Sequence, residues 1–204
     1  MNACDFFYRY DKIVIFDTEF TTWEGALEGG WSGPNEHREI VQIAAQKIDL
    51  MHETVIDRYE QLVRPRINSE LSDYFQDLTG ISQQSIDAGG VDFQEMFEVF
   101  DAWAGDLDRY AYGCRVDEPA DVAVLEENIA LYKLPLTISR QQYGNLASVY
   151  QSIGVDTSQY NSGKLFEAFG LKLDGHEHNA MHDVDSLVQS LFATRRILLG
   201  SATV

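Results

Sequence analysis

Basic residues, cysteines and long apolar runs are all scarce in this chain of 204 residues. It carries 15 Lys and Arg against 33 Asp and Glu, a formal net charge of −18, and the basic residues are scattered. Long phosphate backbones are usually held by clustered Lys and Arg, so this charge disfavours a broad surface that follows a duplex. Bound divalent cations would reverse the charge locally, which keeps capture of a short single-stranded end possible.

The scarcity of cysteine and of membrane-length segments narrows the cellular setting. Cys4 and Cys114 are the two cysteines, too few and too far apart for a disulfide framework or a zinc motif. No apolar run is long enough to span a bilayer. The first residues also do not show the basic head and apolar stretch of a secretory signal. We expect a cytoplasmic protein that does not enter a membrane.

The length and an apolar content of 45% predict one globular domain with a full core. We expect the central part of this domain to cover about residues 10–200. The Gly-rich stretch at about 24–35 is the one segment that has the composition of an insertion or a lid.

Apolar periodicity predicts strands in the first part of the chain and mostly helices afterwards. Three consecutive strands with short joins predict an antiparallel meander within an α/β domain. The expected strands are Ile13–Phe16, Ile40–Ile48, Val55–Val63 and Tyr110–Gly113, and the expected helices are Leu71–Leu78, Phe93–Trp103, one through Val122–Ile129, Asn145–Ile153, Gly163–Phe169 and one from Val184 onward.

Two acidic residues, Asp17 and Glu19, follow the first apolar strand directly. Side chains two apart on a strand point to the same side, so both carboxylates face one spot. Two like charges this close resist joint ionisation unless a cation neutralises them. The pair therefore predicts half of a metal site, although acids at a solvated strand end would show the same pattern.

A second group of chemically active residues precedes the last helix. Apolar residues over Val184–Leu191 recur at helical spacing and predict its buried face. Asp183 flanks this face, whereas His182 and Asp185 fall on the outer side by the same count. His178 lies at the junction of loop and helix, where its ring can turn toward the same site. We expect this group to supply the other half of the site.

In this order the motifs resemble those of the DEDDh family of 3′→5′ exonucleases. The resemblance rests on Asp-x-Glu-x-Thr after the first strand, a central Asp heading a helix, and a final His-x4-Asp. LVRPRINSELSDYFQDLTGISQQSID is similar to the Eri-type branch of that family, and KLFEAFGLKLDGHEHNAMHD to its last active-site segment. The resemblance implies a single exonuclease domain over residues 1–204 with a ribonuclease-H-like α/β fold. In that fold a mixed sheet, an antiparallel meander plus parallel strands, is flanked by helices.

The resemblance also implies an activity. A member of this family hydrolyses terminal phosphodiesters of single-stranded nucleic acid to nucleoside 5′-monophosphates with two Mg²⁺ or Mn²⁺ ions; we expect RNA rather than DNA 3′ ends. By position, Asp17, Glu19, Asp183 and a central Asp are metal ligands, and His178 is the general base. Oxygen ligands suit these ions, paired ions suit an in-line displacement, and a neutral imidazole accepts a proton near physiological pH.

The central acid has two candidates in YGCRVDEPADVAVL. Asp117 fits the family's distance from Gly113. Asp121 fits the helix, because it precedes Leu125 by four residues, and Pro119 in the first helical turn would leave Asp117 in the preceding loop. We predict that Asp121 is the ligand and keep Asp117 as the alternative.

Substrate contacts are predicted at three positions. Ile81 matches a position that packs against the terminal base in relatives, and Phe20 and Thr21 are placed to contact the terminal sugar. Ordinary loop and core packing explains these three residues equally well. The basic residues expected to border the cleft and meet phosphates are Arg115, Arg140 and Lys164.

Two other functions stay open from the sequence. The acidic surface is compatible with a module that binds nucleic-acid ends without cleaving them. So is the central acid Asp121, which is displaced from the family's usual distance to Gly113. A nuclease subunit that depends on a partner protein is the second alternative, and no sequence feature identifies such a partner.

Overall fold

The computed structural model describes residues 1–117 and 121–200. Its helices are α1 (Ala3–Arg9), α2 (Ala26–Gly29), α3 (Asp73–Thr79), α4 (Gln83–Gly89), α5 (Phe93–Ala104), α6 (Asp121–Leu131), α7 (Ala147–Gln151) and α8 (Ala180–Gly200), with the 3₁₀ helices η1 (Arg140–Gln142), η2 (Thr157–Gln159) and η3 (Ser162–Phe169). Its strands are β1 (Lys12–Phe20), β2 (Ile40–Asp49), β3 (Thr54–Leu62), β4 (Arg109–Ala111) and β5 (Tyr143–Asn145).

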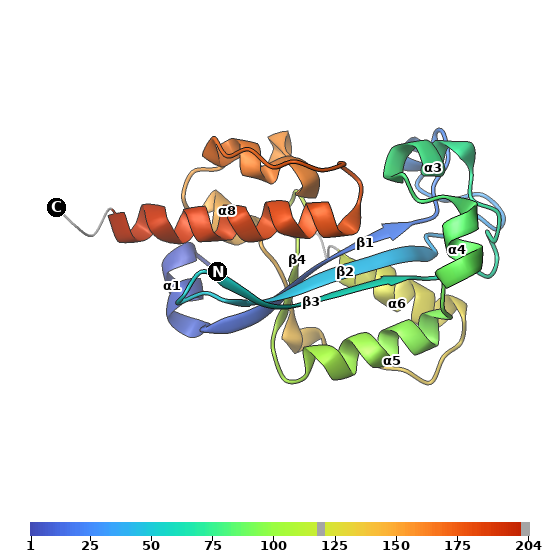
Figure 1. The fold of residues 1–204 in the computed structure, drawn as a ribbon, viewed down its shortest axis with the longest axis horizontal. Helices are drawn as coiled ribbons and strands as arrows, with labels where there is room; N and C mark the ends of the chain where they lie inside the picture. Colours follow the sequence, from blue (N-terminus) through green and yellow to red (C-terminus); the bar gives the residue numbers. More distant parts are fainter. Residues whose placement is uncertain (118–120, 201–204) are drawn as a thin grey trace.

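In the described part of the chain the strands form one mixed sheet in the order β3-β2-β1-β4-β5. β1 pairs with β2, and β2 with β3, in antiparallel fashion. β4 lies parallel to both β1 and β5. The predicted antiparallel meander plus parallel strands, flanked by helices, is therefore confirmed (Figure 1).

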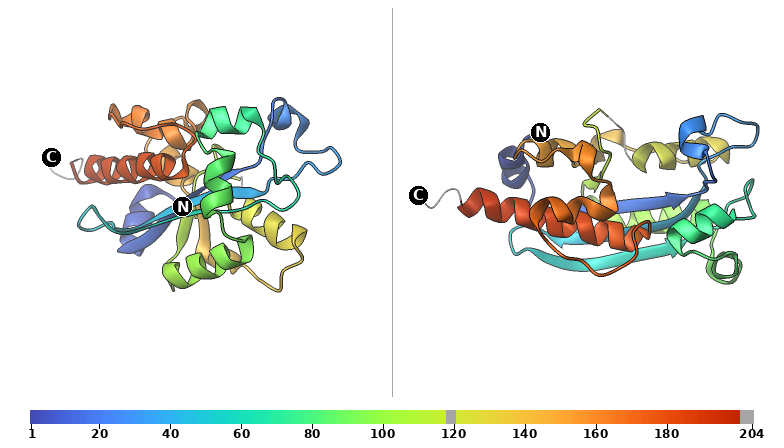
Figure 2. Two further views of the ribbon diagram at one scale, coloured as in Figure 1. Left: turned by 45° about the vertical axis from the view of Figure 1, so that its right-hand side comes forward. Right: turned by 90° about the horizontal axis from the view of Figure 1, so that it is seen from above.

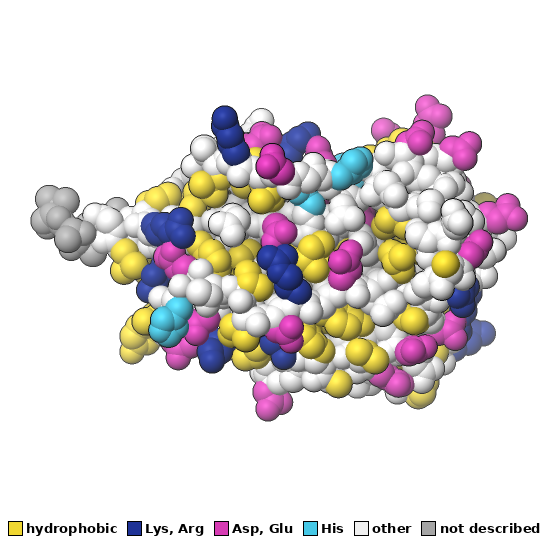
Figure 3. Space-filling model, in the orientation of Figure 1, with side chains coloured by type: hydrophobic (Ala, Val, Ile, Leu, Met, Phe, Trp, Pro, Cys, Tyr) yellow, Lys and Arg dark blue, Asp and Glu magenta, His cyan; other side chains and the backbone are white. Residues whose placement is uncertain are grey.

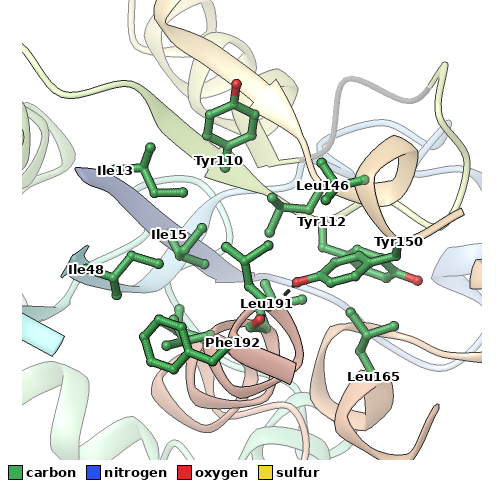
Figure 4. Close-up of a cluster of buried hydrophobic side chains, with 14 of the residues drawn as sticks. Ile13, Ile15, Ile48, Tyr110, Tyr112, Leu146, Tyr150, Leu165, Leu191 and Phe192 are labelled. Carbon is green, nitrogen blue, oxygen red and sulfur yellow. Dashed lines mark hydrogen bonds between the residues drawn. The ribbon is translucent and has the colours of Figure 1, made fainter. Parts of the chain in front are cut away.

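Each face of the sheet is covered by helices that bury alternate residues of β1. Ile13 and Ile15 point into the cluster under α8, whereas Val14 and Phe16 point into the cluster with α5. Figure 4 shows the first cluster, in which the Tyr150 hydroxyl donates to the carbonyl of α8. Because side chains alternate along a strand, this pattern also decides which face each later residue of β1 reaches.

α3 and α4 pack at one end of the sheet, as Figure 2 shows. Ser72 caps α3 by accepting a hydrogen bond from the Phe75 backbone N–H, and its hydroxyl donates to the Thr22 carbonyl at 2.6 Å. Ser72 thus ties this helix to the segment that follows β1.

Several elements differ from the sequence prediction. α1, α2, α4 and β5 were not predicted, and the predicted helix over Asn145–Ile153 begins only at Ala147. Asn145 instead pairs with Ala111 of β4, and its side-chain oxygen accepts from the Ala147 N–H at 2.9 Å. Gly163–Phe169 lies in a 3₁₀ helix, and α8 begins earlier than predicted, at Ala180. None of the described helices combines the length and the apolar character needed to cross a membrane.

Candidate active site

β1 carries two acids to the α8 side of the sheet. Asp17 and Glu19 continue the Ile13 and Ile15 row, so their side chains emerge on the face that α8 covers. Asp17 is 5% exposed, and both residues sit opposite β2, at Ala44 and Gln42 respectively. The predicted common orientation of the pair follows from this alternation.

The first turn of α8 brings Asp183 to the same point. Its side chain is 2% exposed, and its Oδ2 accepts a hydrogen bond from the Ser162 hydroxyl at 2.8 Å. Its Oδ1 is buried and has no hydrogen-bond partner within the described residues. Glu19, His178 and Asp183 each offer one ligand atom, and these atoms lie within 4.8 Å of one another.

Asp121 reaches this point from the other side of the sheet. Thr18 points away from its two acidic neighbours, and its hydroxyl donates to Asp121 Oδ1 at 2.5 Å. Asp121 is the first described residue of α6 and lies four residues before the buried Leu125, in agreement with the helical count. Asp117 is exposed and pairs with Arg115 at 3.3 Å. Pro119, used in that prediction, lies outside the described residues.

The four carboxylates strongly perturb one another. Burial raises the pKa of Asp17 well above its usual range, and the charges of Asp121, Asp183 and Glu19 raise it further. Burial, followed by the charges of Asp183 and Asp121, does the same to the pKa of Glu19. Burial also raises the pKa of Asp183, and it raises that of Asp121 to about 6 against the opposing hydrogen bond from Thr18. Such a cluster ionises fully only with a compensating cation.

This donor set fits divalent metal ions. The four groups are all-oxygen ligands, which suit hard cations. Asp183 Oδ1 is a buried acceptor for which the described residues supply no donor, and a metal ion would satisfy it. Asp17, Glu19, Asp121 and Asp183 are the residues that would hold such ions.

His178 lies at the rim of the cluster in a loop held by η3. Its φ of 63° is in the left-handed region, which is uncommon for a residue other than glycine. The preceding Glu177 accepts from Asn161 Nδ2 at 2.6 Å and from Lys164 Nζ at 2.8 Å. His178 Nε2 lies 3.7 Å from Glu177 Oε1, and the ring is 37% exposed. The imidazole can therefore meet both the acids and solvent.

The three predicted substrate-contact residues occupy different settings. Phe20 is half-buried and lines a hollow of about 470 Å³ together with Asp121. Ile81 is 6% exposed and lines a second hollow of about 470 Å³, beside Gln42. Thr21 is buried, and its hydroxyl donates to the His37 carbonyl at 2.6 Å. The Thr21 side chain thus supports the loop after β1, whereas Phe20 and Ile81 border open space.

Each basic residue expected near the cleft has an acidic partner. Arg115 pairs with Asp117, and Arg140 pairs with Glu126. Lys164, in η3, pairs with Glu177, the residue before His178. A phosphate contact by any of them stays a prediction and would have to compete with a carboxylate.

Three residues that support the site were not predicted. Thr18 could have been found, because strand alternation turns it toward α6. Ser162 carries no sequence signal, since its contact to α8 spans 21 residues. Glu39, at the start of β2, is fully buried and accepts from the backbone N–H groups of residues 66, 67 and 68 and from the Tyr132 hydroxyl. It fixes the loop before α3 to α6.

The sequence model of the family described as Exonuclease (RNase_T) matches residues 14–191, which includes all five residues of the cluster. The chain belongs to the exonuclease family.

Curated relatives of this exonuclease domain carry consistent names. The chain is 26% identical to "3'-5' exonuclease eri1" of Schizosaccharomyces pombe over 86% of its own length and 65% of that protein. It is 27% identical to "3'-5' exoribonuclease 1" of Homo sapiens over 88% of its own length and 51% of that protein. The chain thus spans about half to two-thirds of the length of these relatives.

A solved structure supports the same placement. The nuclease domain of 3'hExo, described as a DEDDh family member bound to rAMP, superposes with a TM-score of 0.72 at 23% identity. The match covers 94% of both chains. At this identity the likeness shows a shared fold, so the predicted ribonuclease-H-like fold is confirmed.

Proposed function

We propose that this chain is a 3′→5′ exonuclease that hydrolyses the terminal phosphodiester of single-stranded RNA and uses two Mg²⁺ or Mn²⁺ ions. The observation that carries the proposal is the convergence of Asp17, Glu19, Asp121, Asp183 and His178 from three separate segments of the chain. The names of the relatives, an exonuclease and an exoribonuclease, favour RNA over DNA. Nucleoside 5′-monophosphates are the expected products.

The residues divide the chemistry between them. When bound, a pair of divalent ions supplies charge stabilisation for the attacking and leaving oxygens of an in-line displacement. The four carboxylates would hold these ions, with Thr18 and Ser162 fixing the orientation of Asp121 and Asp183. His178, at the solvent-facing rim, would accept the proton of the attacking water as general base.

Turnover of labelled RNA tests this proposal directly. We expect 5′-labelled single-stranded RNA to give a stepwise ladder with Mg²⁺ or Mn²⁺ and none with EDTA. His178→Ala should lower the rate by about 10²–10⁴-fold, the usual contribution of a general base, and His52→Ala, which removes a 77% exposed ring from the turn between β2 and β3, is the matched control. Intact RNA in every lane, or an unchanged rate in His178→Ala, would contradict the assignment; a DNA equivalent tests the sugar preference.

Metal binding should also appear as a pH-dependent gain in thermal stability. The pKa of Asp121 is about 6 in the folded chain, against about 3.9 for an unperturbed Asp. The unfolded state therefore loses this proton first, and the metal-free fold loses stability as pH rises from about 4 to about 6. We expect saturating Mg²⁺ or Mn²⁺ to raise the melting temperature by roughly 5–10 °C near pH 7.5 and by much less near pH 4.5.

The control for this melting experiment is Asp121→Asn. This variant should melt higher than wild type in EDTA near pH 7.5, because it removes one buried charge, and it should gain less from metal. Equal metal effects at both pH values in the wild type would contradict the role of the cluster.

The alternatives from the sequence are weakened or left to experiment. A binding module without cleavage was suggested by the displaced central acid, yet Asp121 lies beside Thr18 and interacts with the charges of Asp17 and Asp183. Tight binding of RNA ends without metal-dependent turnover would revive that reading. A subunit that needs a partner protein would show turnover only after the partner is added.

A further inference from the structure

Trp31 of the Gly-rich segment, residues 24–35, pairs with Phe20, the residue of β1 that follows Glu19. The Trp31 ring lies 5.6 Å from the Phe20 ring, centre to centre, at 67°. The Arg38 guanidinium lies over both rings, 5.6 Å from that of Phe20 and 5.8 Å from that of Trp31. Figure 2 shows this segment, in blue, beside the yellow helix α6.

Two hollows lie next to these two rings, one lined by Phe20 and the other by Trp31. The first, of about 470 Å³, is lined by Phe20, Arg38 and Asp121. The second, of about 660 Å³, is lined by Arg38, Trp31 and the later turns of α6, through Ala130. At about 1.5 Å per residue, Ala130 lies about 13 Å along α6 from Asp121. Arg38 lines both hollows, which together mark a path along α6 from Asp121 to Trp31.

Trp31 is held in a fixed position at the end of this path. Its indole N–H donates to the Thr21 carbonyl at 3.0 Å, and its backbone N–H donates to the Ala26 carbonyl at 3.3 Å. Its φ is 51°, a conformation that is costly for a bulky residue. Such backbone strain is concentrated at functional sites, and a fixed aromatic ring is a good stacking surface because little entropy is lost on binding.

The charges along this path favour a base over a phosphate. Arg38 already pairs with Glu127, and Glu36 adds a second carboxylate to the larger hollow. These carboxylates repel phosphate but can accept hydrogen bonds from the amino groups of adenine, cytosine or guanine. Figure 3 shows acidic side chains gathered over the α3 end of the molecule. This surface therefore also disfavours binding of the RNA backbone through its phosphate charges. Stacking of bases on aromatic rings is the remaining way to hold a single strand.

We propose that the hollow beside Trp31 is a base-binding subsite for single-stranded RNA, in which one base stacks on Trp31 with Arg38 at its edge. The inference rests on the proposed function, because the path starts at the acidic cluster. At about 3.4 Å per stacked nucleotide, 13 Å corresponds to about four nucleotides. The base belongs to one of the last four nucleotides of the RNA.

Binding of abasic RNAs to Trp31 variants tests this subsite. The protein carries Asp183→Asn so that RNA is not consumed, and fluorescence anisotropy measures binding of 5′-labelled RNAs with one abasic nucleotide at each of the last four positions. Trp31→Ala should weaken binding of intact RNA about 5- to 150-fold, the range for loss of one stacked base. At one of the four positions, the abasic RNA should bind equally well to the proteins with and without Trp31. That RNA already lacks the base that would stack on the ring.

Two further variants make the result specific. Trp31→Phe keeps an aromatic ring and should retain most of the affinity, and Tyr8→Ala, which removes a 95% exposed ring from α1 at the opposite end of the sheet, should change nothing (Figure 1). The subsite is overturned if Trp31→Ala has no effect, or if it weakens all four abasic RNAs as much as intact RNA. A wild-type protein that cleaves RNA but shows no such coupling refutes the subsite alone. Failure of the wild type to bind or cleave any RNA refutes the proposed function and the subsite together.

Discussion

Asp183→Asn is expected to abolish turnover of RNA, by about 10³-fold or more, while the protein stays folded. Asp183 offers the buried Oδ1 that lacks a partner within the described residues, and it lies within ligand distance of Glu19 and His178. Loss of several kcal/mol of charge stabilisation in the transition state corresponds to at least three powers of ten in rate. Asparagine keeps the size of the side chain and can still accept from Ser162, so the fold should persist.

Asp185→Asn is the matched control, because it removes the same charge two residues later on α8. Asp185 is 30% exposed and accepts hydrogen bonds from Arg58 of β3 and Gln46 of β2 rather than joining the cluster. Initial rates on labelled RNA and melting curves should be measured for both variants and for Asp17→Asn. Near-wild-type rates in both Asp17→Asn and Asp183→Asn would refute the site, and equal losses in Asp183→Asn and Asp185→Asn would indicate a general effect of charge.

Glu39→Ala is expected to lower the free energy of unfolding by about 3–5 kcal/mol. The Glu39 carboxylate is fully buried and accepts from three successive backbone N–H groups and from Tyr132. Alanine would leave these donors buried without an acceptor, at about 1–3 kcal/mol each, less whatever solvent recovers. For a domain of this size the melting temperature should fall by about 10 °C.

Urea denaturation of Glu39→Ala measures this effect. Glu98→Ala, an exposed position on α5, is the control and should change stability by less than about 0.5 kcal/mol. Glu39→Gln keeps the size of the side chain but places an amide N–H₂ group where the second carboxylate oxygen accepts from backbone N–H groups. It therefore separates the effect of side-chain size from the effect of losing an acceptor. A change of under about 1 kcal/mol in Glu39→Ala would show that the loop over residues 66–68 finds other partners.

Local periodicity was enough to predict much of the sheet and the grouping of the acids. Alternation along β1 places Asp17 and Glu19 on one face, and the helical count places Asp121 and Asp183 at the first turns of α6 and α8. These patterns depend only on neighbouring residues, which is why a single sequence shows them. The order of motifs then indicated the family, which the family match confirmed.

Features that depend on distant contacts could not be predicted. β5 has three residues and exists because it pairs with β4, and Asn145 therefore continues no helix. The acceptor role of Glu39 requires residues 27 to 29 positions away. The bond of the Thr21 hydroxyl to the His37 carbonyl, 16 residues away, was likewise not predictable, and a contact of Thr21 with substrate stays a prediction. In each case the partner is brought near only by the completed fold.

The two faces of β1 make the centre sensitive to chain length. Asp17 and Glu19 emerge on the α8 side, while Thr18, between them, reaches α6 on the other. A one-residue deletion or insertion within the strand would exchange these sides, sending the threonine toward α8 and the acids toward α6. Repacking can accommodate point substitutions in the buried part of β1. A single-codon insertion or deletion, in contrast, would separate Asp17 and Glu19 from Asp121 and Asp183 even in a protein that still folds.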